Sequence, residues 1–406
     1  MKNTLLIPLL FLFLLSACAP VSSAPTGPIT PGQESAVGCR VTPHEYARLG
    51  NSIPMGVLAS IPGSPGLSLI WRDGTSLKTW QTGTLAGRMN AHLAGSGNDE
   101  GDTVPLVFLG MDANGLSQLK VSLNGETTVI REFPRSVTVT NLIGIPTLPV
   151  IAYLTVESFA DGTGLRSQVF LGDYQSIASA NPILSIESSD PQIIQVVAIY
   201  RDVNNSPTGL WYTYAPWGIG GDSLTDPHAG LFFIDLASGK SLEFLSMGCN
   251  FASLSVSQSW AAWESDGVLY AADLHTAEPI SFSRLSGYDR GPVHAFLGPG
   301  DGYLAWMEGK GSEYDGTLDT TLRVGTLERY LIGEYPLTAF IEPSGLGEGI
   351  VITPLGWMAS ENYNLVVAAY NASTERAVLL SVDVNAGKIT LLSEVNREGF
   401  AGFAYP

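Results

Sequence analysis

Three features of the sequence predict an all-β fold. Short apolar runs alternate with turns rich in Gly, Asp and Asn, which is the pattern of consecutive strands joined by tight connections. No long stretch repeats its apolar residues with the 3.6-residue period of an amphipathic helix. The chain also holds 45 Gly and 25 Pro, while charged residues make up 14%. Such a composition favours strands and turns over long helices stabilised by ion pairs.

A hairpin pattern recurs along the chain. Residues 230–244, 267–282 and 379–392 each contain an apolar strand, an Asp, a turn and a second strand. Four-stranded units of about 40–55 residues with such turns are typical of propeller blades. The sequence therefore predicts a single β-propeller of seven four-stranded blades, with six or eight blades as alternatives. Further apolar runs, which we expect to be inner strands, lie at residues 260–263, 303–306 and 365–370.

The predicted propeller domain covers residues 38–406. A ring of blades must close, and joining the two chain ends within one blade removes exposed strand edges. We therefore expect residues 38–51 to supply or brace a strand in the last blade. The seven expected units are residues 52–98, 103–146, 148–190, 192–248, 252–291, 293–340 and 345–398.

One turn and two hairpins resemble a known family. The run G-P-G-D-G-Y-L-A-W at residues 298–306 resembles the S-P-D-G-x-x-L-A-F motif of TolB-type and WD-repeat-like propellers. Residues 234–240 and 382–388 resemble the outer hairpin of the same blades. The resemblance implies that the Pro-Asp-Gly turn links blades and that the apolar strand lines the core. It implies no particular activity, because propellers host many unrelated functions.

The amino-terminal residues resemble the leader of a bacterial lipoprotein. Lys2 precedes an apolar run of eleven residues from Leu5 to Leu15, and Leu-Ser-Ala-Cys follows as residues 15–18. A membrane-spanning helix needs about 20 apolar residues, so this run has the length of a signal-peptide core. We predict a signal peptide at residues 1–17, lipidation of Cys18, and anchoring outside the cytoplasmic membrane of the bacterial cell envelope. An ordinary signal peptide cut after residue 17 is the alternative.

The residues after Cys18 predict a tether and a disulfide. Residues 18–37 combine Pro with Ser, Thr and Gly, a composition that favours an extended linker over a packed core. Two further cysteines remain, Cys39 and Cys249, in a compartment where disulfides persist. We predict that they are bonded to each other; two buried free thiols are the alternative.

The charge balance excludes one class of partner. The formal net charge is −18, with 20 Lys and Arg in total and no basic cluster. A nucleic-acid-binding protein needs a basic surface that displaces counterions from phosphates. We therefore expect no nucleic-acid partner, and we expect the folded body to avoid anionic lipid.

Signatures of catalysis and of metal binding are weak in this sequence. There is no G-x-S-x-G nucleophile elbow, which disfavours a propeller peptidase. Residues 71–80 carry an imperfect version of the Asp-box turn of sialidases. The five His lack metal-ligand spacing, so we expect no metal or other cofactor. Residues 98–102, N-D-E-G-D, allow Ca²⁺ as an alternative to a solvated acidic loop.

The strongest candidate for a ligand site is the aromatic stretch at residues 209–230. We interpret it as one long connection that projects from a face of the propeller, where such loops often carry function. Aromatic rings beside carboxylates are common in sugar and peptide recognition. The alternative is a hairpin whose aromatic side chains pack on their own blade. The candidate ligand-binding residues are Trp211, Tyr214, Trp217, Asp222, Asp226 and His228.

The function expected from these features is that of a non-catalytic binding or assembly module for a protein, a peptide or a glycan. A glycan-processing hydrolase with carboxylates at the central channel is the alternative. The hydrolase requires two carboxyl groups about 5–10 Å apart across a pocket. The binding module requires an aromatic-rimmed face without such a pair.

Overall fold

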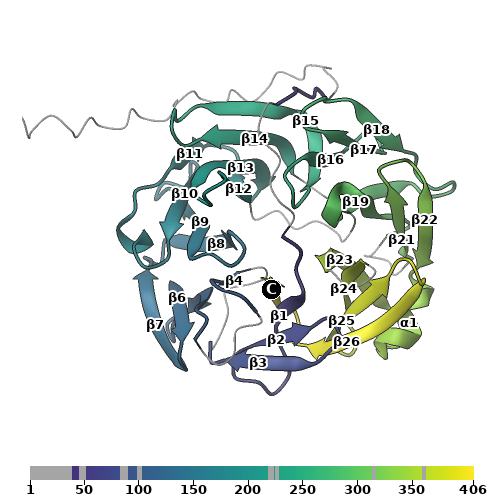
Figure 1. Ribbon diagram of the computed structural model, residues 1–406, viewed down its shortest axis with the longest axis horizontal. Helices are drawn as coiled ribbons and strands as arrows, with labels where there is room; N and C mark the ends of the chain where they lie inside the picture. Colours follow the sequence, from purple (N-terminus) through teal and green to yellow (C-terminus); the bar gives the residue numbers. More distant parts are fainter. Residues whose placement is uncertain are drawn as a thin grey trace, which may run out of the picture.

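The computed structural model describes residues 39–44, 52–82, 90–97, 103–217, 224, 228–312, 317–358 and 363–406. The described strands pair in antiparallel sheets that surround a common centre, as Figure 1 shows. This is the arrangement of a β-propeller, so the predicted fold is confirmed. No helix in the described part is long and apolar enough to cross a membrane.

The described strands form five four-stranded sheets and one seven-stranded sheet. The first sheet contains β27 (Phe400–Ala404), β1 (Gly56–Ser60), β2 (Leu67–Trp71) and β3 (Ser76–Trp80). The second contains β4 (Ala91–Leu93), β5 (Leu106–Met111), β6 (Ser117–Leu123) and β7 (Glu126–Glu132). The third contains β8 (Val137–Gly144), β9 (Val150–Ser158), β10 (Leu165–Asp173) and β11 (Leu184–Ser188), with the 3₁₀ turn η1 (Ile177–Ser179) before β11.

Two further four-stranded sheets come from the carboxyl-terminal half of the chain. One contains β19 (Arg290–Leu297), β20 (Tyr303–Lys310), β21 (Asp319–Thr326) and β22 (Leu331–Pro336), with the 3₁₀ turn η2 (Pro299–Asp301) between β19 and β20. The other contains β23 (Ile350–Met358), β24 (Asn364–Asn371), β25 (Arg376–Asp383) and β26 (Lys388–Val395). The helix α1 (Thr338–Ser344) connects them.

The seven-stranded sheet joins two groups of four strands through one shared strand. Its strands are β12 (Gln192–Arg201), β13 (Pro207–Pro216), β14 (Ala229–Asp235), β15 (Ser241–Leu254), β16 (Trp260–Ser265), β17 (Val268–Asp273) and β18 (Pro279–Phe282). Early residues of β15, such as Leu245, pair with β14, whereas later residues, such as Phe251, pair with β16. The strand therefore belongs to both groups, and the count of seven blades stays a prediction.

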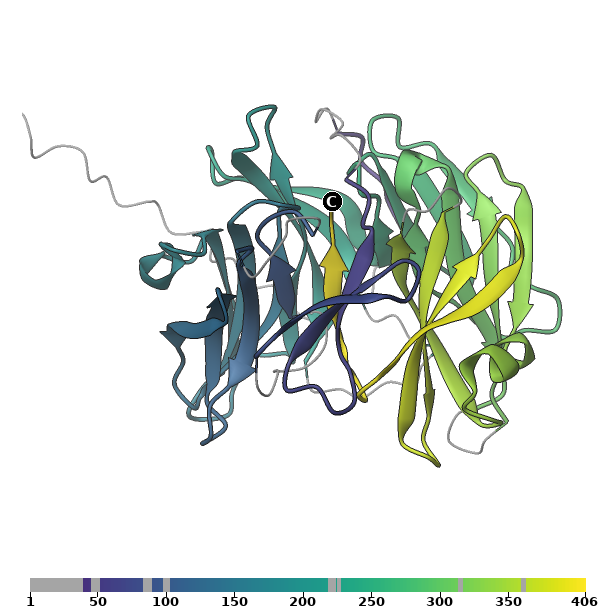
Figure 2. The same ribbon diagram turned by 60° about the horizontal axis from the view of Figure 1, so that its bottom comes forward.

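The ring closes through the carboxyl-terminal strand. β27 pairs with β1, with Ala404 opposite Gly56, so the last strand completes the first sheet. In Figure 2 the yellow end of the chain stands among the purple strands of the amino-terminal part. The expectation that residues 38–51 brace the last blade is wrong for the described residues 39–44. They lie instead along β15, where Val41 forms a bridge with Leu245. The two chain ends do meet in one sheet, which leaves neither end strand of the ring without a partner.

Several predicted unit boundaries are displaced by one strand. β4 pairs with β5, so it belongs with the second sheet and not with the unit at residues 52–98. β8 pairs with β9, so it opens the third sheet and does not end the unit at residues 103–146. The runs expected to be inner strands are β16, β20 and β24, which are the second strands of their groups. An apolar run on a second strand resembles an inner strand because both are covered on two faces.

The outer hairpins follow the predicted pattern. The hairpins β14–β15, β17–β18 and β25–β26 form at the three expected places. In each turn an Asp accepts hydrogen bonds from backbone N–H groups a few residues later: Asp235 from Ser238, Asp273 from His275 and Asp383 from Asn385. This side-chain capping is the physical reason that an Asp recurs at the end of the third strand. The turn at residues 298–302, by contrast, joins β19 to β20 within one sheet and does not link two blades.

The first strands of neighbouring sheets are connected through β-bulges. Register shifts occur in β8, β12, β15, β19 and β23, each time against the second strand of the sheet. At the bulge of β8, Asn141 has a φ of 56° and accepts a hydrogen bond from the Val196 N–H of β12. A β-bulge leaves one residue unpaired, so that its side chain or carbonyl can point away from the hydrogen bonds between its own strand and the next. These redirected groups connect one sheet to the next around the centre.

The same connection recurs on the opposite side of the ring. The Leu297 N–H of β19 donates to Ser253 Oγ of β15 at 3.1 Å, and Trp357 Nε1 of β23 donates to the Phe296 carbonyl of β19 at 2.9 Å. Ser253 and Phe296 both lie where the register shifts. Packing of apolar side chains between the sheets is therefore supplemented by directional hydrogen bonds, which fix the position of each sheet relative to the next.

Candidate functional site

The predicted loop at residues 209–230 begins as a strand. Residues up to 216 belong to β13, which pairs with β12 and β14, so the interpretation of one long projecting connection is wrong for this half. Trp211 is 0% exposed and packs edge-on against Phe233 and Phe244, with ring centroids 4.9 and 6.2 Å away. A ring buried in this way offers no surface to a ligand. Trp211 is therefore a core residue, as the packing alternative requires.

Tyr212 and Tyr214 point to the other face of β13, because side chains alternate along a strand. Both rings pack against Phe232 of β14, with centroids 5.4 and 5.3 Å away. Burial raises the pKa of each tyrosine above its ordinary value, so both hydroxyls stay protonated at neutral pH. Tyr214, a predicted ligand-binding residue, thus lies in the core between two sheets.

Trp217 and His228 lie at the two ends of the connection that does follow β13. The Trp217 N–H donates to the Pro191 carbonyl at 2.6 Å, and its ring packs, partly exposed, at the edge of the apolar core. His228 Nε2 lies 2.8 Å from Gln195 Oε1 of β12. These contacts place the backbone of Trp217 and the side chain of His228 near the amino end of β12. Their role in ligand binding stays a prediction, and the other two candidates, Asp222 and Asp226, lie outside the described residues.

Leu224 attaches this connection to a distant sheet. Its side chain is 3% exposed and belongs to the apolar core of β19–β22, together with Val293 and Met307. A Cβ atom on Gly309 of β20 would lie 2.3 Å from Leu224 Cδ1, so a larger residue there would displace the Leu224 side chain. Leu224 therefore lies against a sheet beyond the neighbouring strands β15–β18. The sequence signal for this contact is an isolated Leu in a stretch rich in Gly and Asp, and sequence reasoning missed it.

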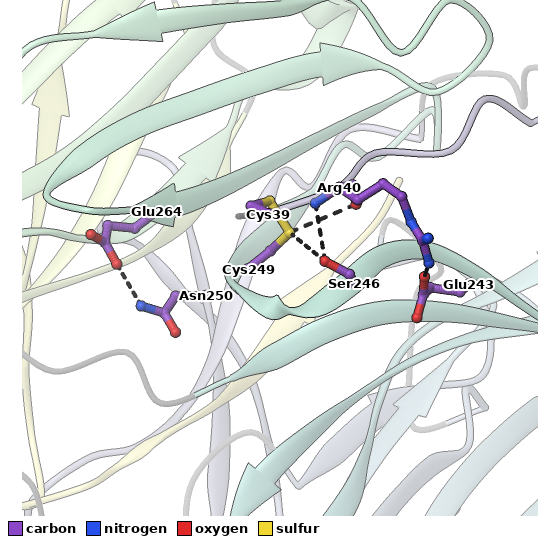
Figure 3. Close-up of a disulfide and its surroundings, with 7 residues drawn as sticks. All are labelled: Cys39, Arg40, Glu243, Ser246, Cys249, Asn250 and Glu264. Carbon is purple, nitrogen blue, oxygen red and sulfur yellow. Dashed lines mark hydrogen bonds and ion pairs between the residues drawn. A yellow bond between two sulfur atoms is a disulfide. The ribbon is translucent and has the colours of Figure 1, made fainter. Parts of the chain in front are cut away.

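The predicted disulfide is present. Cys39 is bonded to Cys249 of β15, at a sequence separation of 210. Figure 3 shows the bond beside Arg40, whose carbonyl accepts a hydrogen bond from the Ser246 N–H at 3.0 Å and whose guanidinium pairs with Glu243. The Phe251 N–H donates to the His228 carbonyl, so the disulfide and His228 lie at the same end of their sheet. Cys18, the predicted lipidation site, lies outside the described residues.

The carboxylates with displaced pKa values have structural roles. The Leu116 N–H holds the pKa of Asp112 below its ordinary value, and the Thr163 N–H does the same for Asp161. Both residues lie in hairpin turns, where their side chains accept hydrogen bonds from the backbone. A general acid needs the opposite shift, upward toward neutral pH. The imperfect Asp box is the β2–β3 hairpin, in which Asp73 caps its own turn.

One carboxylate is fully buried. Glu308 of β20 is 0% exposed and accepts hydrogen bonds from Trp306 Nε1 at 2.7 Å, from Arg323 Nη1 at 2.9 Å and from the Leu285 N–H at 2.6 Å. Arg323 of β21 also lies 3.1 Å from Glu334 of β22. The guanidinium of Arg323 compensates the charge of Glu308, and both carboxylate oxygens accept hydrogen bonds. This carboxylate fastens the segment before β19 to the sheet.

The described residues contain no group of three or more His, Cys, Asp or Glu side chains placed to hold a metal ion. The predicted alternative Ca²⁺ site at residues 98–102 lies outside the described part. One cavity lies between β27 and β24–β26, with a volume of about 40 Å³ and with Tyr370 and Arg397 at its rim. That volume suffices for a water molecule or a small apolar group. Binding pockets for drug-sized ligands are several times larger, about 300–1,000 Å³.

His92 of β4 is buried and neutral. Its Nε2 lies 2.8 Å from the Leu148 carbonyl, and burial lowers its pKa to about 4. A Cβ on Gly144 would lie 2.3 Å from the ring, so this contact between two sheets also depends on a glycine. Because the backbone carbonyl accepts, Nε2 carries the proton of the neutral ring.

We expect the buried His92 to make the fold sensitive to acid. The unfolded chain binds a proton near pH 6.5 but the folded chain only near pH 4, so stability falls as the pH drops from 6.5 to 4, by about 3 kcal/mol. His92→Gln keeps a donor for the Leu148 carbonyl and removes the titration. Urea unfolding at pH 7 and pH 4.5 should show a smaller loss for the variant. Equal losses would contradict this role of His92.

Comparisons with known proteins support the fold. The chain matches no protein-family model and no curated protein. Among solved structures it is similar to a puromycin-hydrolysing peptidase from Mycobacterium tuberculosis, with 13% identity and a TM-score of 0.51, over 88% of this chain and 57% of that one. It also matches an oligogalacturonate lyase in complex with manganese, with 12% identity and a TM-score of 0.48, over 86% of both chains. A structure described as TolB from Agrobacterium tumefaciens has 12% identity and a TM-score of 0.36, over 71% of this chain and 89% of that one.

Proposed function

We propose that this propeller is a lipid-anchored binding or assembly module of the bacterial cell envelope that carries out no chemistry of its own. The observation that carries the proposal is the role of the polar side chains described above. Asp112 and Asp161, whose pKa values are lowered, cap turns, and the buried carboxylate of Glu308 is paired with Arg323. A propeller whose polar groups are used in this way presents a rigid surface for recognition.

The module would bind a protein, a peptide or a glycan at the end of the ring that carries Trp217 and His228. Trp217 is the partly exposed aromatic ring among the predicted binding residues, beside the hydrogen-bonded pair of His228 and Gln195. A flat ring next to polar groups is a common contact for sugars and peptides. The net charge of −18 supports a partner other than nucleic acid.

A binding assay on glycan and peptide arrays tests this proposal. We expect the soluble chain to bind members of one array, and Trp217→Ala to lose that binding while its thermal midpoint stays close to that of the wild type. Trp71→Ala is the matched control, because Trp71 is also partly exposed but lies at the end of β2. Equal binding by both variants would exclude this site.

Membrane attachment is tested through the lipid site. We expect Cys18→Ala to move the protein from the membrane fraction to the soluble fraction of the envelope, because the variant lacks the thiol that accepts the lipid. Mature protein should also be heavier than its sequence mass by two or three acyl chains. A Cys18→Ala variant that stays in the membrane fraction after a high-salt wash would refute the anchor.

The second candidate is a glycan-processing hydrolase. The similarity to solved structures includes a chain described as a puromycin-hydrolysing peptidase. The chain spans 57% of that peptidase, so their likeness concerns the propeller. Release of new reducing ends from a panel of polysaccharides would favour the hydrolase over the binding module.

A further inference from the structure

The first described residues form an arm along the outside of the ring. We call residues 39–44 the arm. Its Thr42 N–H donates to the Phe244 carbonyl at 2.9 Å, and its Arg40 carbonyl accepts from the Ser246 N–H at 3.0 Å, so the arm adds a short antiparallel strand to the edge of β15. The His44 N–H donates to the Leu274 carbonyl at 2.6 Å at the end of β17. The arm thus crosses the join between the two groups that share β15.

The arm lies between two parts of the chain with different mechanical roles. On its amino-terminal side is the segment that we predict to be a tether to the membrane. On its carboxyl-terminal side the chain is next described at Ser52, and it then enters β1, where the Met55 N–H donates to the Ala404 carbonyl. β1 holds β27 and so closes the ring. Without a clamp, tension on the tether would pass along the chain to the strand that closes the ring.

The disulfide changes the path of that tension. Cys39 is the first described residue of the arm, and its bond leads directly to Cys249, where β15 passes from β14 to β16. Cys249 is buried in the core with Trp211 and Phe233. The hydrogen bonds of the arm are each worth only about 1 kcal/mol, and a pull from one end would open them one after another. A covalent bond at the first residue of the arm prevents this.

We propose that the Cys39–Cys249 bond is a strain-relief clamp, which transfers tension on the amino-terminal tether to the packed centre of β15 and keeps it away from the β1–β27 closure. The inference rests on the proposed anchoring for its physiological meaning. The force that the disulfide bears can be measured on the soluble chain, whether or not Cys18 carries a lipid. Failure of the anchor test would therefore be distinguishable from failure of the clamp.

Single-molecule pulling tests the clamp. One handle is attached at residue 37 and the other at residue 203, through a non-natural amino acid that replaces Val203, which is 97% exposed in the β12–β13 turn. With the disulfide intact, the loaded path runs from Cys39 to Cys249 and back through β15, β14 and β13, and its fully extended length is about 160 Å. After reduction of the same molecules the path runs through the arm and β1, and its fully extended length is about 570 Å.

The force of the first rupture decides the question. We expect the oxidised chain to rupture at a higher force than the reduced chain, and the reduced chain to lengthen in early steps that include β1. Arg40→Ala is the matched control, since it removes an exposed ion pair of the arm but keeps the disulfide, and it should behave like the oxidised wild type. Equal first-rupture forces in oxidised and reduced chains would overturn the proposal.

Discussion

Replacement of Arg323 by Leu is expected to destabilise the propeller by about 3–5 kcal/mol, because it leaves the charge of Glu308 buried without a partner. Glu308 is 0% exposed and receives its hydrogen bonds from Trp306, Arg323 and Leu285. Loss of the guanidinium also removes the hydrogen bond to the Ser283 carbonyl. Denaturant unfolding of wild type and variant measures the difference.

A double-mutant cycle separates the pair from the rest of the contacts. Glu308→Leu together with Arg323→Leu removes both charges, and a well-packed apolar pair often restores much of the stability lost by one substitution. We expect the double variant to be more stable than Arg323→Leu alone. If the two substitutions were simply additive, the buried charge would not be the cause of the loss.

Removal of the disulfide is the other change with a large expected effect. The double variant Cys39→Ala/Cys249→Ala should lose about 2–5 kcal/mol of unfolding free energy, since a bond that closes a loop of 210 residues restricts the unfolded chain. Thermal unfolding of the oxidised wild type and of the variant gives the comparison.

The control for this prediction is Arg40→Ala. The Arg40 side chain is 66% exposed, and its ion pair with Glu243 should contribute less than about 1 kcal/mol. A large loss in Arg40→Ala and a small loss in the alanine pair would show that the ion pair of Arg40 with Glu243, and not the covalent bond, holds this edge of the ring.

The local features of the fold could be predicted from the sequence because their causes are local. An apolar strand followed by an Asp marks an outer hairpin, since that carboxylate caps the turn that it begins, as Asp235 and Asp383 do. Two cysteines beyond the predicted lipid site, in a compartment that the leader predicts to be oxidising, predict a bond to each other. These signals need no knowledge of the remainder of the chain.

The wrong predictions concern contacts between distant residues. β4 has three residues and reads as a fragment of the preceding unit, although it pairs with β5. The aromatic residues of β13 suggested a binding loop, because a strand covered on both faces has no alternation of polar and apolar residues to identify it. The pairing of Val41 with Leu245 joins segments about 200 residues apart, for which a single sequence carries no local signal.

The candidate site was predicted only in part for the same reason. The position of Trp217 next to the core depends on Pro191, and the neutralisation of Glu308 depends on Arg323 in the next strand. Leu224 and Gly309 are the clearest example. Neither residue is unusual in its own segment, and their contact cannot be predicted from either segment alone.

The sharing of β15 between two groups of strands has a consequence for rearrangement of the chain. New chain termini at α1, or in the turn between β14 and β15 that follows Asp235, would interrupt a connection but no strand pairing. We therefore expect circular permutants with termini at these places to fold. An opening within residues 246–249 would interrupt β15, which pairs with both β14 and β16. It would also place a chain end beside Cys249, the residue bonded to Cys39. Such a ring can be opened at its connections, but β15 has to remain one continuous strand, because both groups of strands pair with it.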